Sequence, residues 1–131
     1  MRSEREVFRT GGGAEDLAGY ARAVRTGSWV SVSGTAPASR GGVREQTLDA
    51  FRLALDAVEH FGGTIESVAR TRVFLASGCD WQGAADAHRE LFGEVTPANT
   101  TLFVAGFIPE GVLVEVEIDA VLHGGTSRFP P

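Results

Sequence analysis

Residues 43–76 read VREQTLDAFRLALDAVEHFGGTIESVARTRVFLA, and the hydrophobic period changes within this passage. In its first part, large apolar side chains recur at spacings of three and four residues, as on the buried stripe of an amphipathic helix: Leu48, Phe51, Leu55 and Val58. Most polar side chains lie off this stripe: Gln46, Asp49, Arg52, Asp56 and Glu59. We predict a helix over residues 43–61, ended by Gly62 and Gly63, because glycine adopts the left-handed backbone conformation without strain.

The second part of the passage, residues 67–76, alternates with a period of two and predicts a strand. One face of this strand carries Arg70, Arg72 and Phe74. The other face carries a smaller and more apolar set: Ala69, Thr71, Val73 and Leu75. A long helix flanked by strands indicates a β–α–β crossover.

Three short strands are predicted on the N-terminal side of the long helix. Residues 6–10 form the first and end at the glycine run of residues 11–13. Residues 20–25 and 29–33 are rich in β-branched and aromatic side chains and flank a turn that contains Gly27, so they predict a hairpin. A loop rich in glycine, serine and proline follows.

On the C-terminal side, Asp80 is predicted to cap a second helix, which ends at Gly93. Its apolar stripe is Trp81, Ala84, Ala85, His88, Leu91 and Phe92. Residues 100–107 and 112–122 predict the last two strands. The order βββαβαββ favours an α+β fold, in which two helices pack on a six-stranded sheet as a two-layer sandwich.

The length and composition point to one small globular domain. The chain has 131 residues, and we assign residues 1–124 to the domain and residues 125–131 to a flexible C-terminal tail. The net charge is −5 and the arginines are scattered, which makes a nucleic-acid partner an unfavoured interpretation. A single cysteine, Cys79, suits a reducing compartment. Since no signal peptide or membrane-spanning stretch is visible, we expect a cytoplasmic protein without a membrane partner.

The last predicted strand alternates apolar and acidic side chains. Its acidic face carries Glu115, Glu117 and Asp119. Alternating acids of this kind are typical of a solvated sheet face. Arg70 and Arg72 lie on the corresponding face of an earlier strand, so the two strands together predict an ion-paired patch opposite the helices. This patch is either a solvated surface or the lining of a subunit interface.

Several passages, in order along the chain, resemble proteins of the RidA/YjgF/L-PSP family. They span about residues 17–122 and comprise residues 20–24 with Gly27, 32–37, 45–47, 68–75, 97–101 and 114–120. The resemblance implies a chorismate-mutase-like fold, with a six-stranded mixed sheet and both helices on one face. It also implies that three copies form a trimeric barrel, with small-molecule sites between the subunits. On this interpretation the ion-paired patch is buried between subunits.

The family resemblance also implies a chemistry, namely the hydrolysis of reactive enamines and imines. Water adds to an electrophilic iminium carbon and ammonia leaves, which requires positioning and one proton-transferring group but no cofactor or metal. In deaminase members an arginine clamps the substrate carboxylate through two hydrogen bonds. Here Asn99 occupies that position, in a divergent branch that lacks the arginine. Because the lost charge-assisted contact is worth about 1.5–3 kcal/mol, we expect amino-acid-derived imino acids to be poor substrates.

The resemblance points to site residues, and four of the five candidates also have a structural alternative. It makes Glu117 the catalytic residue that positions water, with an ion pair to Arg70 or Arg72 as the alternative. The candidate substrate-binding residues are Tyr20, Asn99, Thr100 and Arg72, and Arg72 is included because it could supply a displaced positive charge in the cleft. Tyr20 alternatively packs on the sheet, Asn99 alternatively forms the turn into a strand, and Arg72 alternatively makes an interface salt bridge. His88 lies on the apolar helix stripe, which favours a core histidine.

Three functions remain open on the sequence. The first is an enzyme that acts on a small electrophilic metabolite between subunits. The second is an endoribonuclease, the activity behind the name L-PSP, although the acidic composition and the missing aromatic–basic stripe speak against it. The third is a non-catalytic trimer that binds a metabolite. The expected partners are further copies of the chain and a small-molecule ligand, and no metal-ligand spacing is present.

Overall fold

The computed structural model of the protein describes residues 4–123. The six strands are β1 (Arg5–Phe8), β2 (Ala23–Thr26), β3 (Trp29–Thr35), β4 (Val68–Ala76), β5 (Ala98–Val104) and β6 (Val114–Val121). The helices are α1 (Gly13–Ala18), α2 (Val43–His60) and α3 (Trp81–Phe92), with a 3₁₀ turn over Ile65–Ser67. The tail predicted for residues 125–131 lies outside the described residues.

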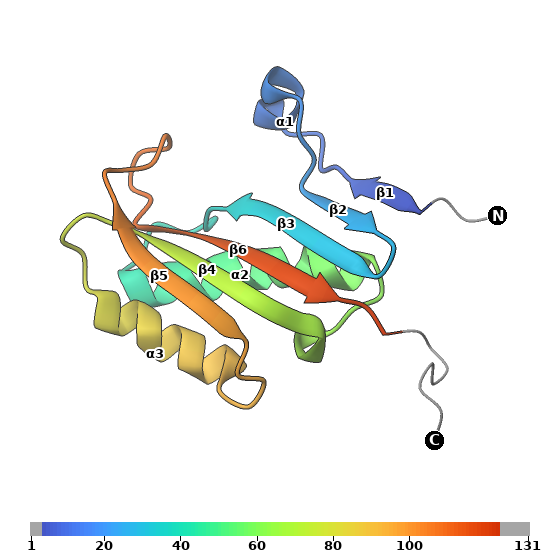
Figure 1. The fold of residues 1–131 in the computed structure, drawn as a ribbon. Coiled ribbons are helices and arrows are strands. Elements are labelled where there is room, and N and C mark those ends of the chain that lie inside the picture. The colour runs from blue at the N-terminus through green and yellow to red at the C-terminus, as the bar shows by residue number, and fades with distance from the viewer. Residues whose placement is uncertain (1–3, 124–131) are drawn as a thin grey trace.

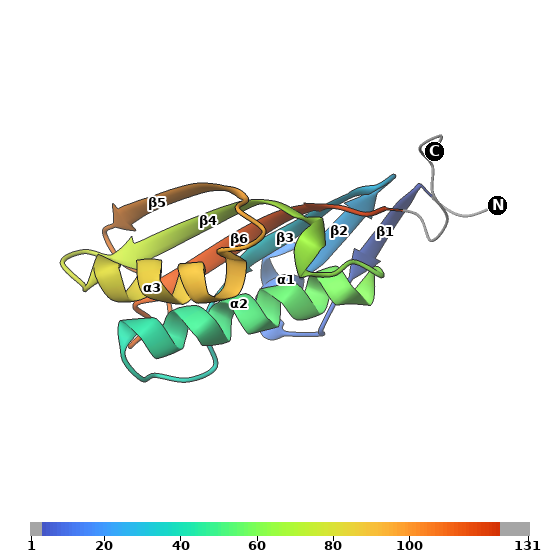
Figure 2. The same ribbon diagram turned by 90° about the horizontal axis from the view of Figure 1, so that it is seen from below.

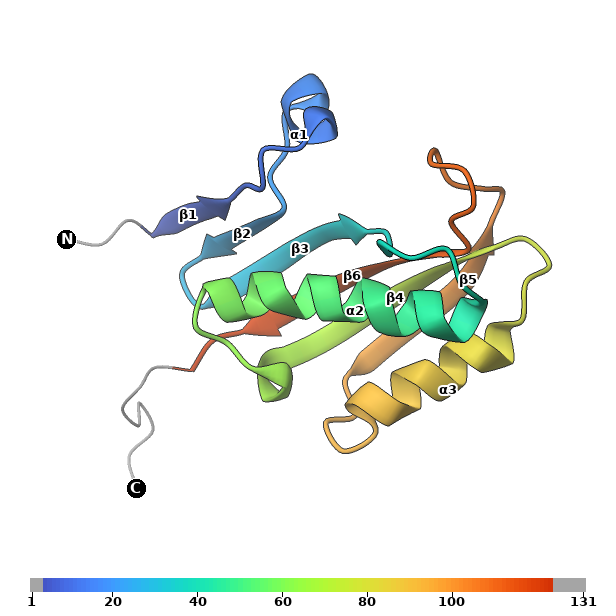
Figure 3. The ribbon, with the colours of Figure 1, turned by 180° about the vertical axis from the view of Figure 1, so that it is seen from behind.

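The strands form one mixed sheet in the order β1-β2-β3-β6-β4-β5 (Figure 1). All neighbouring pairs are antiparallel except β4 and β5, which are parallel and are joined through α3. The long helices α2 and α3 lie side by side on the same face of the sheet (Figures 2 and 3). These features confirm the predicted α+β fold, with a six-stranded mixed sheet and its two main helices on one face.

The core lies between the sheet and the apolar stripe of α2. Phe51 and Val58 are fully buried against sheet residues such as Val30 and Ile118. One polar residue departs from the prediction, because Gln46 is also fully buried. Its Nε2 donates to the carbonyl oxygens of Gly41 and Gly111, and its Oε1 accepts from the Leu113 backbone N–H. Gln46 thereby fixes the β5–β6 connection against the start of α2.

Two details of the predicted faces are wrong. The pairing of β4 with β6 shifts between Val68 and Arg70, and this irregularity leaves Ala69 exposed instead of facing the helices. In α3, two residues of the predicted apolar stripe are exposed as well. Trp81 has a relative accessibility of 52%, and Ala85 is also exposed. Both side chains lie near β5, the edge strand, where the helix extends past the cover of the sheet.

The short helix α1 was not predicted and projects beyond the ends of β1 and β2 (Figure 1). Its six residues include only one large apolar side chain, Leu17, which is 91% exposed, so no buried stripe marks it. The helix is held instead by polar contacts. The buried Glu15 carboxylate accepts hydrogen bonds from the Thr10 backbone N–H and hydroxyl group. Gly19 ends α1 with φ of 76°, a value that glycine adopts without strain.

Candidate functional site

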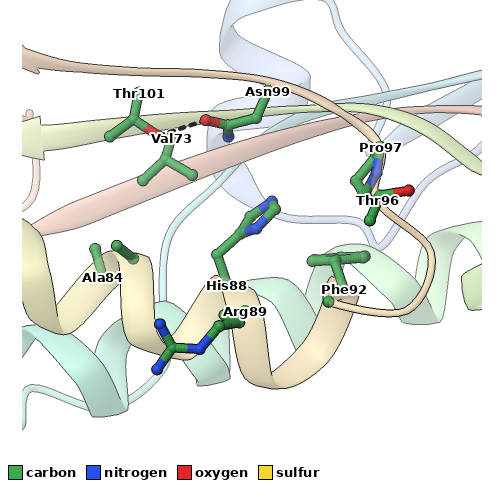
Figure 4. A pocket seen from close by; sticks show the side chains of 11 residues that line it. Val73, Ala84, His88, Arg89, Phe92, Thr96, Pro97, Asn99 and Thr101 are labelled. Carbon is green, nitrogen blue, oxygen red and sulfur yellow. Dashed lines mark hydrogen bonds between the residues drawn. The ribbon is translucent and has the colours of Figure 1, made fainter.

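The residues predicted for the site lie in three separate places within one chain. Thr100, Arg72 and Glu117 are on the sheet face away from α2 and α3, which follows from the strand register and the alternating burial of β4 and β6. Asn99 lies one residue before Thr100 on β5 and faces the helix side (Figure 4). Tyr20 is near the N-terminal edge of the sheet.

The face away from the helices carries a cluster of charged side chains, which we call the charged face: Arg70, Arg72, Glu115, Glu117 and Asp119. The Arg72 guanidinium NH1 is 3.1 Å from Asp119 Oδ2 and 3.5 Å from Glu117 Oε1. Arg70 donates to the Thr100 hydroxyl at 3.4 Å. The ion pairs expected between these strands are therefore present, and the pair with Arg72 is the structural alternative given above for Glu117. Arg72 is engaged on the charged face and does not approach Asn99.

Glu115 occupies the same face as Glu117 but lies in a different environment. Burial raises the pKa of the Glu115 carboxyl group; the charge of Arg22 opposes this effect and that of Glu117 adds to it. The carboxylate packs over Gly34, where a Cβ atom would lie 3.2 Å from Glu115 Oε1. The sequence placed Glu115 on the acidic face as an interface or site residue without a specific catalytic task, and the alternation of β6 was the only local signal for it.

Tyr20 contacts a separate concavity near the first two strands. This cavity of about 420 Å³ is lined by Arg5, Val7, Arg9, Gly19, Tyr20, Ala21, Val24 and Ser33. Tyr20 is 38% exposed, so its ring is not held in the core of the chain. Packing on the sheet, the structural alternative for Tyr20, therefore buries only part of its side chain.

Another cavity of about 420 Å³ lies between α3 and β5, and we call it the α3–β5 cavity. Its apolar wall is formed by Val73, Ala84, Ala85, Phe92 and Pro97. The polar side chains on its lining are His88, Arg89, Thr96, Asn99 and Thr101. Figure 4 shows the His88 ring rising from α3 toward Asn99 on the sheet. The cavity thus combines an apolar wall with a few converging polar groups, as small-molecule sites commonly do.

A chain of hydrogen bonds connects the polar groups of this cavity. The Thr101 hydroxyl donates to Asn99 Oδ1 at 3.0 Å, and Asn99 Nδ2 donates to Thr71 Oγ1, also at 3.0 Å. Thr71 Oγ1 in turn lies 2.7 Å from His88 Nε2. Asn99 is therefore part of strand β5, directly opposite Thr71 on β4, and does not form a turn.

His88 belongs both to the core and to the cavity lining. Its ring packs against Phe51 and Phe92, with centroids 5.6 and 4.9 Å away. Burial lowers the pKa of His88 below its ordinary value, so the imidazole is neutral at pH 7. The apolar stripe correctly indicated a packed histidine. Its place beside Asn99 depends on how α3 crosses β5, which no local pattern reveals.

Residues 4–123 show neither a metal-binding cluster nor a membrane-spanning helix. They contain no group of three or more His, Cys, Asp or Glu side chains arranged to hold a metal ion. No helix in this part of the chain is long and apolar enough to cross a membrane.

Comparisons with known proteins match the architecture described above. The family model described as endoribonuclease L-PSP matches residues 13–122. A crystal structure of a Mycobacterium tuberculosis member of the YjgF/YER057c/UK114 family superposes with a TM-score of 0.85 at 34% identity, covering 90% of this chain and 99% of that one. A putative endoribonuclease L-PSP from Entamoeba histolytica superposes with a TM-score of 0.74 at 26% identity, covering 88% and 94%.

Two curated relatives extend this similarity. An uncharacterized protein of Streptomyces coelicolor is 46% identical over 112 residues, which cover 81% of this chain and 84% of the relative. A protein of Dermatophagoides farinae named 2-iminobutanoate/2-iminopropanoate deaminase is 26% identical over 92% of this chain and 99% of its own length. The resemblance inferred from the sequence is thereby confirmed, and the chain belongs to the RidA/YjgF/L-PSP family.

Proposed function

We propose that this protein hydrolyses a small, reactive enamine or imine in clefts between the subunits of a homotrimer. The observation that carries the proposal is the separation of Asn99 from Glu117. Asn99 lies on the helix side of the edge strand β5, whereas Glu117 projects from the opposite face of β6. One chain does not bring them together. A second copy that lays its charged face against β5 would supply Glu117 to the α3–β5 cavity of the first.

The surface of β5 supports such a contact. As the last strand of the sheet, β5 has one backbone edge without a neighbouring strand among residues 4–123. It also exposes Leu102 at 41% and Phe103 at 49%, close to the exposed ring of Trp81. Edge strands and contiguous apolar patches of this kind are typical of protein–protein contacts. A homotrimer is the assembly that the family resemblance implies for this contact.

The reaction assigns distinct tasks to the groups of the shared cleft. Water attacks the iminium carbon, a carbon–oxygen bond forms, and the resulting carbinolamine collapses to a carbonyl compound and ammonia. Glu117 orients the water and accepts its proton, which then passes to the departing nitrogen. Arg72 keeps the Glu117 carboxylate in place through their ion pair, and Asn99 holds the substrate from the helix side of β5. Thr100 lies on the other face of β5, where Arg70 donates to its hydroxyl, so it is not part of this cavity. Tyr20 lies near the opposite end of the sheet from β5, so it reaches this cleft only from another copy of the chain.

The test is ammonia release from a panel of enamines and imines, some with and some without a carboxylate. We expect turnover of at least one uncharged compound and little turnover of amino-acid-derived imino acids. If ligands bind in the cleft without any ammonia release, the protein is a metabolite-binding trimer instead. If it cleaves RNA and Glu117→Gln abolishes the cleavage, the endoribonuclease interpretation replaces ours.

A further inference from the structure

We infer that the α3–β5 cavity selects an uncharged ligand that joins an apolar body to a carboxamide-like group, one that both donates and accepts hydrogen bonds. Asn99 hydrogen-bonds to this group, and Thr71 and His88 are positioning residues that fix the orientation of the Asn99 side-chain amide. The inference rests on the proposed function, whose substrate class it narrows.

The charges around the cavity favour an uncharged ligand. Among the described residues that line it, Arg89 is the one permanently charged side chain. Arg89 donates to Asp86 Oδ1 at 2.6 Å, and its side chain is 76% exposed. Figure 4 shows its guanidinium group directed away from Asn99. Since burial favours the neutral form of His88, a carboxylate beside Asn99 meets no cation among the described lining residues other than the outward-directed Arg89, and desolvating it there is unfavourable.

The remaining hydrogen-bonding capacity of Asn99 indicates the kind of polar group. A carboxamide has two N–H donors and two acceptor lone pairs. One N–H of Asn99 is used by Thr71, and one lone pair accepts from Thr101. One donor and one acceptor of the Asn99 amide remain. A carboxylate has no hydrogen to offer the free lone pair of Oδ1, whereas a carboxamide, or an imine with an N–H group, carries both a donor and an acceptor.

The Thr71 hydroxyl explains why the amide of Asn99 keeps this orientation. Thr71 is fully buried and has a single hydroxyl hydrogen. While it accepts from Asn99 Nδ2, we assign that hydrogen to the contact with His88 Nε2, which corresponds to the neutral tautomer of His88 with its proton on Nδ1. A 180° rotation of the Asn99 amide would exchange its oxygen and nitrogen. Oδ1 would then face the Thr71 hydroxyl, whose hydrogen already bonds to His88. The series of hydrogen bonds from His88 through Thr71 therefore keeps the Asn99 amide in one orientation.

The lining of the cavity determines the polarity and the size of the rest of the ligand. Five of the lining residues are apolar: Val73, Ala84, Ala85, Phe92 and Pro97. A volume of about 420 Å³ lies within the usual range for small-molecule sites. A compact hydrocarbon body next to the polar group is the complementary shape.

The experiment compares cyclohexanecarboxamide with cyclohexanecarboxylate, which share an apolar body and differ in the polar group. Binding at neutral pH is measured by calorimetry, and the site is located by NMR shifts of the Asn99 and Thr101 amide signals. We expect the carboxamide to bind the wild-type protein at least about tenfold more tightly. Asn99→Arg should reverse this preference. Equal or tighter binding of the carboxylate to the wild type, or no shift at Asn99 with either probe, overturns the inference.

Thr71→Val tests the positioning role, because it keeps the side-chain volume and removes the hydroxyl. We expect it to weaken carboxamide binding several-fold. The matched control is Thr47→Val, another fully buried threonine, whose hydroxyl donates to the Val43 carbonyl away from the cavity. Unchanged carboxamide binding by a folded Thr71→Val protein contradicts the positioning role. If Thr71→Val does not fold, the reversal expected for the exposed residue Asn99 still decides the inference.

Neither probe is a substrate, so these results are independent of turnover. A preference for the carboxamide without any enamine or imine hydrolysis supports the inference and contradicts the proposed activity. Hydrolysis combined with a preference for the carboxylate supports the activity and overturns the inference.

Discussion

The charged face and the α3–β5 cavity lie on opposite sides of the same sheet, and their polar groups differ in kind. The charged face holds ionised side chains that pair with one another, such as Arg72 with Asp119 at 3.1 Å. The cavity holds neutral groups joined by hydrogen bonds, with Asn99 at their centre. One region suits proton transfer and the other suits recognition of an uncharged group. A site that uses both therefore needs two copies of the chain.

The largest expected effect comes from separating the copies. Leu102→Asp places a charge on the exposed apolar edge strand, so we expect the trimer to dissociate and all turnover to be lost. Light scattering measures this directly, since the wild type should have three times the 13.8 kDa mass of one chain. Leu53→Asp is the matched control, because Leu53 on α2 is similarly exposed at 39% and should tolerate the charge. A wild-type protein that is monomeric removes the basis for a shared site.

Removing the charge of Glu117 should have the next largest effect. Glu117→Gln preserves the shape, and we expect turnover to fall about 100-fold or more because the proton acceptor is lost. The trimer and the melting temperature should be unchanged. Asp119→Asn, which removes the other carboxylate paired with Arg72, should retain most of the turnover. If Glu117→Gln instead melts several degrees lower or dissociates, the ion pair with Arg72 is structural and the catalytic assignment is wrong.

Asn99→Arg should have a smaller effect that changes specificity. A guanidinium group beside the cavity restores a charge-assisted contact worth about 1.5–3 kcal/mol. We expect kcat/KM for 2-iminopropionate to rise about 10- to 100-fold over a weak wild-type value. Comparable wild-type activity on this compound would mean that another cation of the assembled protein already binds the carboxylate.

The smallest expected effect concerns the stability of the cavity at acid pH. Burial lowers the pKa of His88, so the unfolded chain takes up a proton at a higher pH than the folded protein does. The stability linked to neutral His88 is complete above the unfolded pKa of about 6.5 and is lost as the pH falls below it. His88→Phe keeps the aromatic packing against Phe51 and Phe92, and its melting temperature should fall less between pH 7 and pH 5. An equal fall in both proteins would show that another group controls this range.

The fold was predictable because its main elements carry strong local patterns. The stripe of α2 and the alternation of β6 each depend on side chains that are close in the sequence. Helix α1 lacks such a pattern, since it is held by the contacts of Glu15 with Thr10 and not by buried apolar residues. The exposure of Trp81 was also missed, because helical periodicity does not show where the sheet ends.

The sequence indicated which residues belong to the candidate site but not how they are arranged in space. The resemblance indicated Asn99 and Glu117, but the parallel pairing that places Asn99 opposite Thr71 is a long-range feature without a local signal. Position in the sequence therefore did not reveal that the two residues face opposite sides of the sheet. The same limit applies to His88, whose packing partners and cavity come from separate elements.

Subunit complementation tests the shared site most directly. Ala85→Trp fills the α3–β5 cavity from the exposed side of α3, and Glu117→Gln disables the charged face. We expect each variant alone to lose turnover. If every cleft combines one cavity with the Glu117 of another copy, unfolding and refolding an equal mixture should restore about a quarter of the clefts. Recovery near this level supports the account, whereas no recovery in verified mixed trimers would contradict it.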